Sequence, residues 1–535
     1  MSAALVVVLL MCAVTGLALF AKRIDVPFPV AFVLGGAALA FVPNLPHIEL
    51  DPELIFLLVL PPLLFSGGWA TDYVEFKRNR RAIGLLAIGL VVFSTVIVAI
   101  VAHALMPALS WPLAFVLGAV VAPPDAVAAE AILERLSVPR RVAAILSGES
   151  LVNDATALVF YRFATAAAVG GAFTLAQGGI AFVFVSLGGI AVGLAVGGLF
   201  ELVMRFLSKK GLDDPTISNA IGLIAPFASY LPAEALHVSG VLSAVAAGMY
   251  LGRRSAHFWD SETRLIGGAV WEVLIFLLNG FVFVVIGLQL PVITKGLSGA
   301  PWHYVLAAVV ISALVILIRP IWIFPATYLP RLLSKKVREA DPPPSWRVVT
   351  VLSWTGMRGI VSLAAALAIP LSARIGNATV DLTGARDEIL FVTFCVIFAT
   401  LVLQGFTLAP LIRMLGVAES SSRERVETEV RIGALEAGIE ELHAQERTFS
   451  SALEWETVGR LLGEYAQRIE HLKGHLSADE GEEEPRENAL DHRLQKAALV
   501  AERRKITELR SAGKIPDDVF RNIQYDLDLA DVRLT

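Results

Sequence analysis

Long apolar segments recur along the first three quarters of this chain, and they restrict its fold more than any other feature. A window of about 20 apolar residues matches a hydrocarbon core of about 30 Å. In lipid such a window must form a helix, because only a helix satisfies its own backbone hydrogen bonds. Only 17% of all residues are charged and the mean hydropathy is +0.68, so we predict an all-α polytopic membrane protein. Thirteen windows qualify: 3–20, 26–43, 53–69, 82–105, 111–132, 138–166, 175–204, 216–232, 238–252, 265–290, 302–329, 347–370 and 387–412.

Basic residues in the connecting segments predict the orientation. Lys and Arg gather in alternate segments, including 77–81, 135–141 and 331–338, whereas the opposite segments carry few of them. Short cytoplasmic loops carry this excess in membrane proteins. With an odd number of spans, the N-terminus is expected outside and the C-terminal part in the cytoplasm. We expect a multi-pass protein of the cell membrane.

The segment after the last window has a different composition. From Val417 onward there are 26 acidic and 17 basic residues, a net charge of −9, and the remainder carries +4. We therefore predict a transmembrane domain at 1–416 and a helical cytoplasmic tail at 417–535. A tail this acidic lacks the basic surface that nucleic-acid binding needs. We expect it to be a packing or regulatory domain whose regulator the sequence does not identify.

Two windows cannot be continuous helices. Pro123 and Pro124 remove two backbone donors in the fifth window. The segment Thr355–Gly359 interrupts the twelfth window and places Arg358 at membrane depth. Non-helical backbone is tolerated there only where protein covers it or where it lines a wet cavity. One interrupted span in each half fits the inverted repeats of secondary transporters, whose ion sites lie where such spans meet.

The stretch GESLVNDA, from Gly148 to Ala155, places two carboxylates inside an apolar window. A charge near the bilayer centre costs roughly 2.5 kcal/mol or more, so a functional role is the first interpretation. On a helix, Glu149, Ser150, Asn153 and Asp154 share an arc of about 140°. We expect all four side chains to be able to face one cavity.

Asp125 and Asp154 are the expected ion-binding residues. An alkali cation prefers hard oxygen ligands, and carboxylates beside a broken helix offer them together with freed carbonyl groups. A proton and a cation can then compete for the same oxygens. The alternative is that both aspartates are structural and paired with polar neighbours. Asn153 and Ser150 can supply neutral ligands, although helix packing explains Ser150 equally well.

Three other charged groups in the apolar windows have expected roles. Arg358 stays protonated under essentially all conditions, and Glu149 is the best available anion, so we predict a structural Glu149–Arg358 ion pair. Glu272, in the tenth window, can add negative potential to the funnel through which cations approach. Snorkelling of Glu272 to the membrane interface is the alternative.

Enzymatic readings have little support. The string Gly-Glu-Ser lacks the second glycine of a nucleophile elbow. The GxGD motif expected of an intramembrane aspartic protease is absent from the sequence. No GK[ST] phosphate loop is present either. Cys12 and Cys395 both lie in apolar windows and support no disulfide framework or cysteine metal site. We predict no catalytic residue and no cofactor.

Three stretches resemble one known family. APPDAVAAEAI, GESLVNDATALV and WTGMRGIVSLAAALAIP are similar to the electroneutral sodium/proton exchanger branch of the monovalent cation/proton antiporters, above all to bacterial members with a cytoplasmic tail. The resemblance implies a homodimer with thirteen helices, a core domain and a dimerisation domain, and elevator-like alternating access. It implies that Asp154 carries the ion and the proton with Asn153 as its partner, and that Asp125 lies where the interrupted helices cross.

One departure from that family concerns the residues around Asp125. Many members have Thr before this aspartate and Pro after it, whereas this chain has Pro124 and Ala126.

We expect one-for-one exchange of Na⁺ for H⁺, with K⁺ or Li⁺ as alternative cations. An ion-sensing membrane protein with the tail as its output and an uncoupled channel are the alternatives from other classes.

Overall fold

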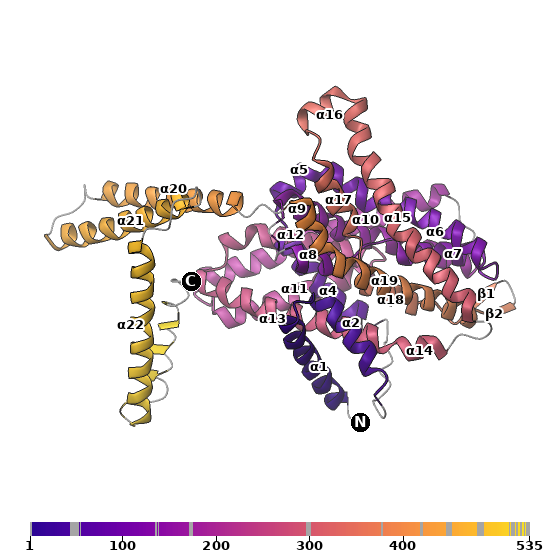
Figure 1. Ribbon diagram of the computed structural model, residues 1–535, viewed down its shortest axis with the longest axis horizontal. Helices are drawn as coiled ribbons and strands as arrows, with labels where there is room; N and C mark the ends of the chain where they lie inside the picture. Colours follow the sequence, from indigo (N-terminus) through magenta and orange to yellow (C-terminus); the bar gives the residue numbers. More distant parts are fainter. Residues whose placement is uncertain are drawn as a thin grey trace. The chain divides into compact units, whose positions relative to one another are not determined.

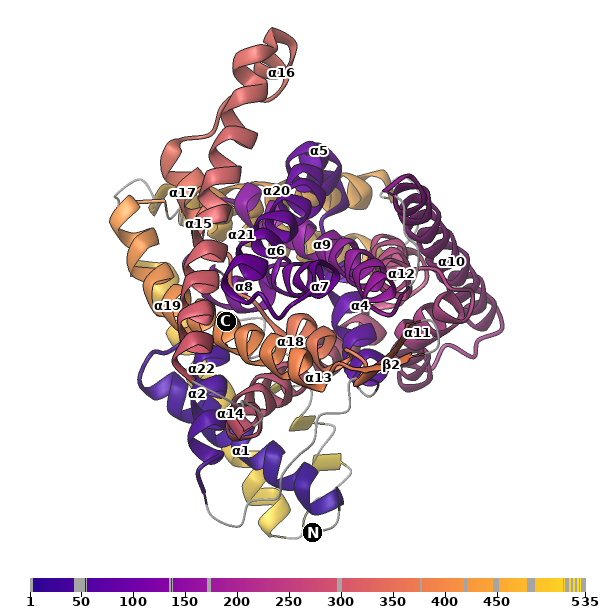
Figure 2. The same ribbon diagram turned by 90° about the vertical axis from the view of Figure 1, so that its right-hand side faces the viewer.

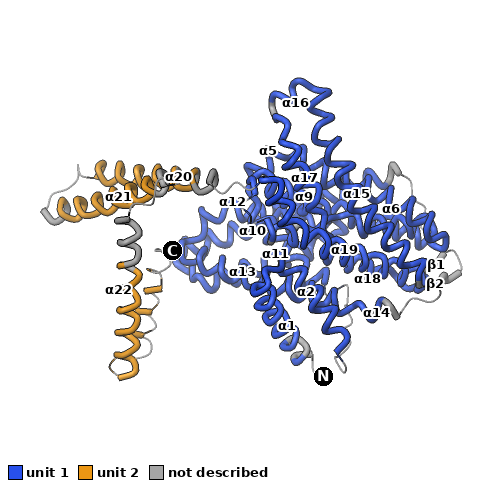
Figure 3. The backbone as a smooth tube through the Cα atoms, viewed as in Figure 1, with its two compact units in different colours: residues 1–418 blue, residues 419–535 orange. Residues whose placement is uncertain are grey.

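In the computed structural model of the 535-residue chain, the described residues are 3–42, 53, 55–133, 136, 138–170, 175–295, 301–375, 378–417, 421–445, 452–478, 486–512, 514, 519–520, 523–524, 527–528 and 530. Two compact units divide it, Met1–Ala418 and Glu419–Thr535 (Figure 3).

The first unit is built from helices and one short hairpin (Figure 1). Its elements, in chain order, are α1 (Ala3–Arg23), α2 (Phe28–Leu39), η1 (Ile55–Val59), α4 (Leu60–Ala70), α5 (Tyr73–Gly84), η2 (Leu85–Leu90), α6 (Val91–Leu105), α7 (Trp111–Val121), α8 (Ala126–Leu133), α9 (Arg140–Ala168), α10 (Leu175–Lys209), α11 (Pro215–Ala235), α12 (Gly240–Arg254), η4 (Ser255–His257), α13 (Ser261–Leu288), α14 (Leu290–Lys295), α15 (Pro301–Leu333), α16 (Lys335–Ala340), α17 (Trp346–Trp354), α18 (Ile360–Leu367), β1 (Ser372–Ile375), β2 (Ala378–Asp381) and α19 (Thr383–Leu415). Strands β1 and β2 pair antiparallel, with Ser372 opposite Asp381.

The second unit contains three long helices: α20 (Ser421–Gln445), α21 (Ala452–Ala478) and α22 (Arg486–Ser511). Helices α20 and α21 pack against each other. Within its described part the charged side chains are mostly exposed and form ion pairs one helical turn apart, as Arg431 does with Glu427. Such surface pairs add little stability. The exposed charges of the described part suit contact with water.

The prediction of an all-α membrane protein is confirmed. Each of the thirteen predicted windows falls on helices of the first unit. Within the described ranges, six helical segments are long and apolar enough to cross a membrane, and they are Tyr73–Leu105, Arg140–Ala168, Gly178–Lys209, Ser261–Leu288, Trp302–Leu333 and Thr383–Leu415. Large apolar side chains are exposed on them, including Ile180, Phe184 and Leu202 on α10. A surface of this kind suits contact with lipid rather than water.

Several helices begin at side-chain caps that the sequence supplies. A cap oxygen accepts backbone N–H groups of the first turn, which have no partner within the helix. The capping residues are Asp72 for α5, Asp214 for α11, Ser239 for α12, Asp260 for α13 and Ser345 for α17.

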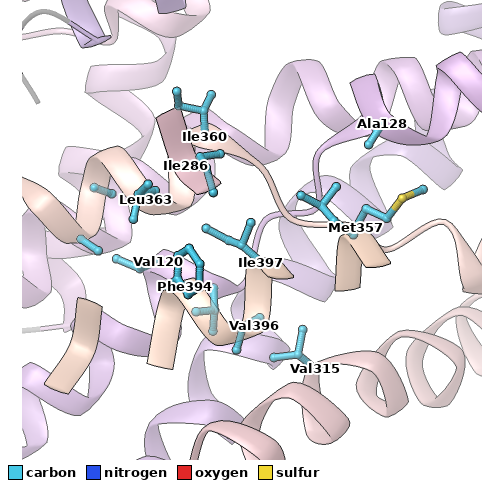
Figure 4. Close-up of a cluster of buried hydrophobic side chains, with 14 of the residues drawn as sticks. Val120, Ala128, Ile286, Val315, Met357, Ile360, Leu363, Phe394, Val396 and Ile397 are labelled. Atoms are coloured by element: carbon cyan, nitrogen blue, oxygen red, sulfur yellow. The ribbon is translucent and has the colours of Figure 1, made fainter. Parts of the chain in front are cut away.

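Both predicted interruptions are present. Helix α7 ends at Val121 and α8 begins at Ala126, with the two prolines between them. Helix α17 ends at Trp354 and α18 begins at Ile360. Buried apolar side chains surround both breaks, and Figure 4 shows Val120, Ala128, Met357, Ile360 and Ile397 in this cluster. The breaks are therefore held inside protein, as non-helical backbone at membrane depth requires.

The helices of the first unit form two groups. The scaffold group consists of α1, α2, η1, α4 and α10–α13, and the site group consists of α5–α9 with η2, α15 and α17–α19. Helices of one group contact each other extensively and contact the other group at fewer places. Figure 2 shows α10, α11 and α12 on one side and α15, α17 and α19 on the other. Both interrupted spans belong to the site group.

Candidate functional site

A cavity of about 90 Å³ lies between the two groups of helices. The scaffold group contributes apolar side chains of α4 and the amide of Asn279 on α13, and the site group contributes most of the polar groups. The polar residues that line the cavity are Asp125, Glu130, Ser147, Ser150, Asp154, Asn279 and Ser362. A cavity with this many polar groups and more than the volume of one water molecule can hold water or a hydrated cation.

Helix α9 presents one stripe of residues to this cavity. Ser147, Ser150, Leu151 and Asp154 line it at positions i, i+3, i+4 and i+7, which is one face of an α-helix. Asp154 is 9% exposed. Among the described residues it has no hydrogen-bond or ion-pair partner. The cavity thus contains a nearly buried carboxylate whose oxygens are available to a proton or a cation.

Asp125 lies where two helices begin. Its Oδ1 accepts a hydrogen bond from the Val127 amide at 2.9 Å and so caps α8, and its own amide donates to the Met357 carbonyl at 2.7 Å. Its carboxylate also touches Gly359, the residue before α18, where a Cβ atom would lie 1.7 Å from Oδ2. Helix N-termini carry partial positive charge. The crossing therefore favours a negative group at Asp125.

Asn153 has a different position from the one expected. Its Nδ2 donates to the Pro124 carbonyl at 2.8 Å, and the side chain is fully buried. It does not line the cavity, and its Oδ1 has no partner among the described atoms. The amide thus satisfies a carbonyl that the double proline leaves without a helical donor. It links α9 to the break that carries Asp125.

The predicted Glu149–Arg358 ion pair is wrong. Glu149 is bound instead by Arg319 of α15, with Arg319 Nη1 donating to Oε1 at 2.6 Å and Nη2 donating to Oε2 at 2.8 Å. Both side chains are 1% exposed. Glu149 therefore faces α15 and not the cavity. The predicted arc on α9 spans about 140°, so residues at its two ends can face different helices.

Arg358 is satisfied by backbone instead. Its guanidinium donates to the carbonyls of Val121 at 3.0 Å and Ala122 at 3.2 Å, at the end of α7, and also to the Gly356 carbonyl. Helix C-termini carry partial negative charge and unpaired carbonyls. The crossing therefore places an arginine at a helix end and an aspartate at two helix starts.

Glu272 does not line the cavity. Its side chain is exposed on α13, and this position is compatible with both the funnel and the snorkelling alternative. The carboxylate that lines the cavity on the side of the basic loops is Glu130 of α8. Glu130 lies in the APPDAVAAEAI stretch, five residues after Asp125, but the sequence analysis did not predict it as a site residue.

Four residues of the site were missed from sequence alone. Ser147 continues the helical stripe of Ser150 and Asp154, so its spacing was an available signal. A lone arginine within the apolar run around residue 319 was a second signal for Arg319. Asn279 is the polar residue of a long apolar run in α13, and Glu130 is the fourth. Their spatial relation to Asp154 required the structure.

The donor set suits a transported cation better than a resident metal. Within the described ranges no group of three or more His, Cys, Asp or Glu side chains could hold a metal ion. Two carboxylates and a few neutral oxygens give hard but incomplete coordination, which alkali cations accept with water completing the shell. Chemically, the arrangement can bind a monovalent cation or a proton.

The family model described as "Sodium/hydrogen exchanger, transmembrane" matches residues 6–414. The chain belongs to the sodium/hydrogen exchanger family. This confirms the resemblance inferred from the three sequence stretches. As a member of this family, the protein is a multi-pass membrane protein of the monovalent cation/proton antiporter superfamily.

Curated relatives agree with this family, and a solved structure shares the fold. This chain is 33% identical to a protein of Escherichia coli named as an uncharacterized Na⁺/H⁺ exchanger, YjcE, over 99% of this chain and 98% of that one. It is 31% identical to a Bacillus subtilis protein named as a sodium, potassium, lithium and rubidium/H⁺ antiporter, over 93% of this chain and 73% of that one. Its fold is similar to that of the sodium proton antiporter MjNhaP1 from Methanocaldococcus jannaschii, with a TM-score of 0.57 at 19% identity, covering 77% of this chain and 98% of that one.

Proposed function

We propose that this protein is a secondary-active antiporter that exchanges Na⁺ for H⁺, with Asp154 as the carrying carboxylate and Asp125 as a second ligand. The observation that supports this most directly is the position of Asp154. It is nearly buried, it faces the cavity, and it has no partner among the described residues. A buried carboxylate without a partner is costly unless it binds a proton or a cation, and either one can replace the other there.

The groups around Asp154 support a one-for-one stoichiometry, in which Asp125 keeps its charge because it caps α8 and lies at the start of α18. Asn153 is an amide, and Glu149 is neutralised by Arg319. One cation therefore replaces one proton, and each cycle moves no net charge. Ser150 and Asn279 line the same cavity and supply neutral oxygens for the cation. Because Pro124 and Ala126 flank Asp125, the side chains next to it offer no hydroxyl ligand, so K⁺ or Li⁺ exchange are alternatives to Na⁺.

The division into two groups of helices suggests how access alternates. The carboxylates belong to the site group, while α4 and α13 form the opposite wall. The cavity extends from Asp154 toward Glu130 and Ser147, on the side of the basic loops, which we assign to the cytoplasm. Movement of the site group along the scaffold group would carry the ion across by an elevator-like motion.

We further propose a homodimer in the cell membrane with the N-terminus outside, a transport domain at 1–416 and a cytoplasmic regulatory tail at 417–535.

The test is cation-dependent pH change in proteoliposomes that contain the purified full chain. A Na⁺ gradient should drive protons into or out of the vesicles against their own gradient, and K⁺ and Li⁺ gradients establish the cation preference. An uncoupled channel would dissipate both gradients, and an ion sensor would move neither ion. Either of these results would contradict the proposal.

A further inference from the structure

A second cavity, of about 50 Å³, lies in the site group at the end where the basic loops gather. Three arginines from three helices line it: Arg81 of α5, Arg141 of α9 and Arg331 of α15. Asp341, between α16 and α17, is the carboxylate that lines it. Its inner wall is apolar. Helices α5, α15 and α17 meet at the same end of the first unit in Figures 1 and 2.

The positive charges in this arginine pocket outnumber the negative charge. Asp341 accepts a hydrogen bond from Arg141 Nη2 at 2.6 Å and another from Arg331 Nη2 at 2.5 Å. The Asp341 carbonyl also accepts from Arg331 Nε at 3.0 Å. Among the described residues, Arg81 has no hydrogen-bond or ion-pair partner. Two guanidinium groups therefore share one carboxylate at a small cavity that a third guanidinium, that of Arg81, also lines.

This chemistry matches a phosphate group. A guanidinium presents planar pairs of donors that fit two phosphate oxygens, and it keeps its charge when partly buried. The cavity has room for one small oxyanion. An anion placed there would complete the coordination of Arg81 and share Arg141 and Arg331 with Asp341.

The position of the pocket favours a phospholipid as the source of the phosphate. Basic pockets between transmembrane helices on the cytoplasmic side bind anionic lipid head groups. Helix α15, which supplies Arg331, also presents Leu317, Ile321 and Leu329 as exposed apolar side chains before Arg331 along the helix. Acyl chains could lie along this helix while the head group occupies the pocket. Free phosphate in water would gain nothing from that apolar surface.

We propose that the pocket formed by Arg81, Arg141 and Arg331 binds the phosphate of an anionic phospholipid. Asp341 acts as an internal competitor for the same arginines. Because Arg141 is the second residue of α9, the bound lipid holds the helix that carries Asp154 against α5 and α15. This inference goes beyond the transport proposal, and its test does not require transport activity.

The test measures the thermal midpoint of the purified full-length protein in detergent as phosphatidylglycerol is added, with phosphatidylcholine as the zwitterionic reference. Phosphatidylglycerol should raise the midpoint of the unchanged protein in a saturable way. Arg81→Ala should raise the half-saturating lipid concentration by roughly fivefold, the value expected for one basic residue worth about 1 kcal/mol.

The matched control is Arg80→Ala, which removes the same charge from the same helix at an exposed position outside the pocket. Its half-saturating concentration should stay close to that of the unchanged protein. Equal weakening by Arg80→Ala and Arg81→Ala would show general attraction to basic loops and would overturn the proposal.

Two further measurements address folding defects and the source of the phosphate. Asp341→Asn removes the competitor, so it should lower the half-saturating lipid concentration, a gain that a misfolded variant would not show. Weaker lipid binding by Asp341→Asn would contradict the inference. Stabilisation by inorganic phosphate that equals the effect of phosphatidylglycerol would overturn the lipid as the source.

Discussion

Glu149 and Arg319 form a bidentate ion pair between α9 and α15, with hydrogen bonds of 2.6 and 2.8 Å and both side chains 1% exposed. The pair joins the helix that carries Asp154 to a helix that also contacts α17 and α19. Arg319 Nε additionally donates to the Leu352 carbonyl at 3.2 Å, near the end of α17. The ion pair therefore stabilises the site group without lining the cavity.

The pairing predicts the outcome of a double-mutant cycle. Glu149→Leu or Arg319→Leu alone should destabilise the protein by about 3–5 kcal/mol, because each leaves the other charge buried and unpaired. The double variant should recover most of that loss. Unfolding of the purified protein in detergent measures the coupling, and the cycle of Glu149 with Arg358 is the control. A larger coupling with Arg358 than with Arg319 would contradict the pairing.

Asp154→Asn should abolish exchange while the protein still folds. The amide keeps the shape of the side chain, but it can neither bind a proton at physiological pH nor balance the charge of a cation. Cation-dependent proton release in everted vesicles measures exchange, and the thermal midpoint reports folding. Glu262→Gln, at an exposed position in the first turn of α13, is the matched control and should retain exchange. Activity retained in Asp154→Asn would remove Asp154 from its proposed role.

Gly359→Ala tests the contact between α18 and Asp125. The added Cβ atom would lie 1.7 Å from Asp125 Oδ2, so the carboxylate must move. We expect the exchange rate to fall by roughly tenfold or more, since small displacements of a reacting group have large effects. Gly198→Ala on α10 adds the same methyl group where no atom lies within 4 Å, and it should leave the rate unchanged. Equal rates in the two variants would argue against a role for the Asp125 position.

Glu130→Gln should raise the apparent KM for Na⁺ by about two- to fivefold, because a carboxylate on the cavity wall concentrates cations near the site. Glu272→Gln should leave the KM unchanged, because Glu272 is exposed and does not line the cavity. The measurement is exchange rate against Na⁺ concentration, at low and high ionic strength. If Glu272→Gln shows the larger effect, the approach pathway runs past α13 instead.

Exchange should not respond to an imposed membrane potential. One cation replaces one proton at Asp154, and neither Asn153 nor the Glu149–Arg319 pair adds a transported charge. Proteoliposomes with K⁺-diffusion potentials of either sign should show the same initial rate of Na⁺-dependent pH change. A clear dependence of that rate on potential would contradict one-for-one stoichiometry.

Local features of the sequence predicted much of this protein. Window length determines which segments form membrane helices, because lipid leaves the backbone no other partners. Pro123 and Pro124 break α7 from α8 for a reason contained in the residues themselves. Helical spacing likewise predicted that Ser150 and Asp154 share a face, and both line the cavity. The three family stretches then predicted the family that the comparison confirmed.

Only the tertiary structure decided which partner each charge has. Glu149 and Arg319 are 170 residues apart in sequence, and two buried arginines were available to one glutamate. Helical periodicity gives the direction of a side chain relative to its own helix, but it does not say which helix lies opposite. Packing placed α15 against Glu149 and the end of α7 against Arg358, and it left Asp154 at the cavity without a partner among the described residues. Asp125, Ser150 and Asp154 were readable from the sequence as site residues, whereas the partner of each charge depended on how distant helices pack.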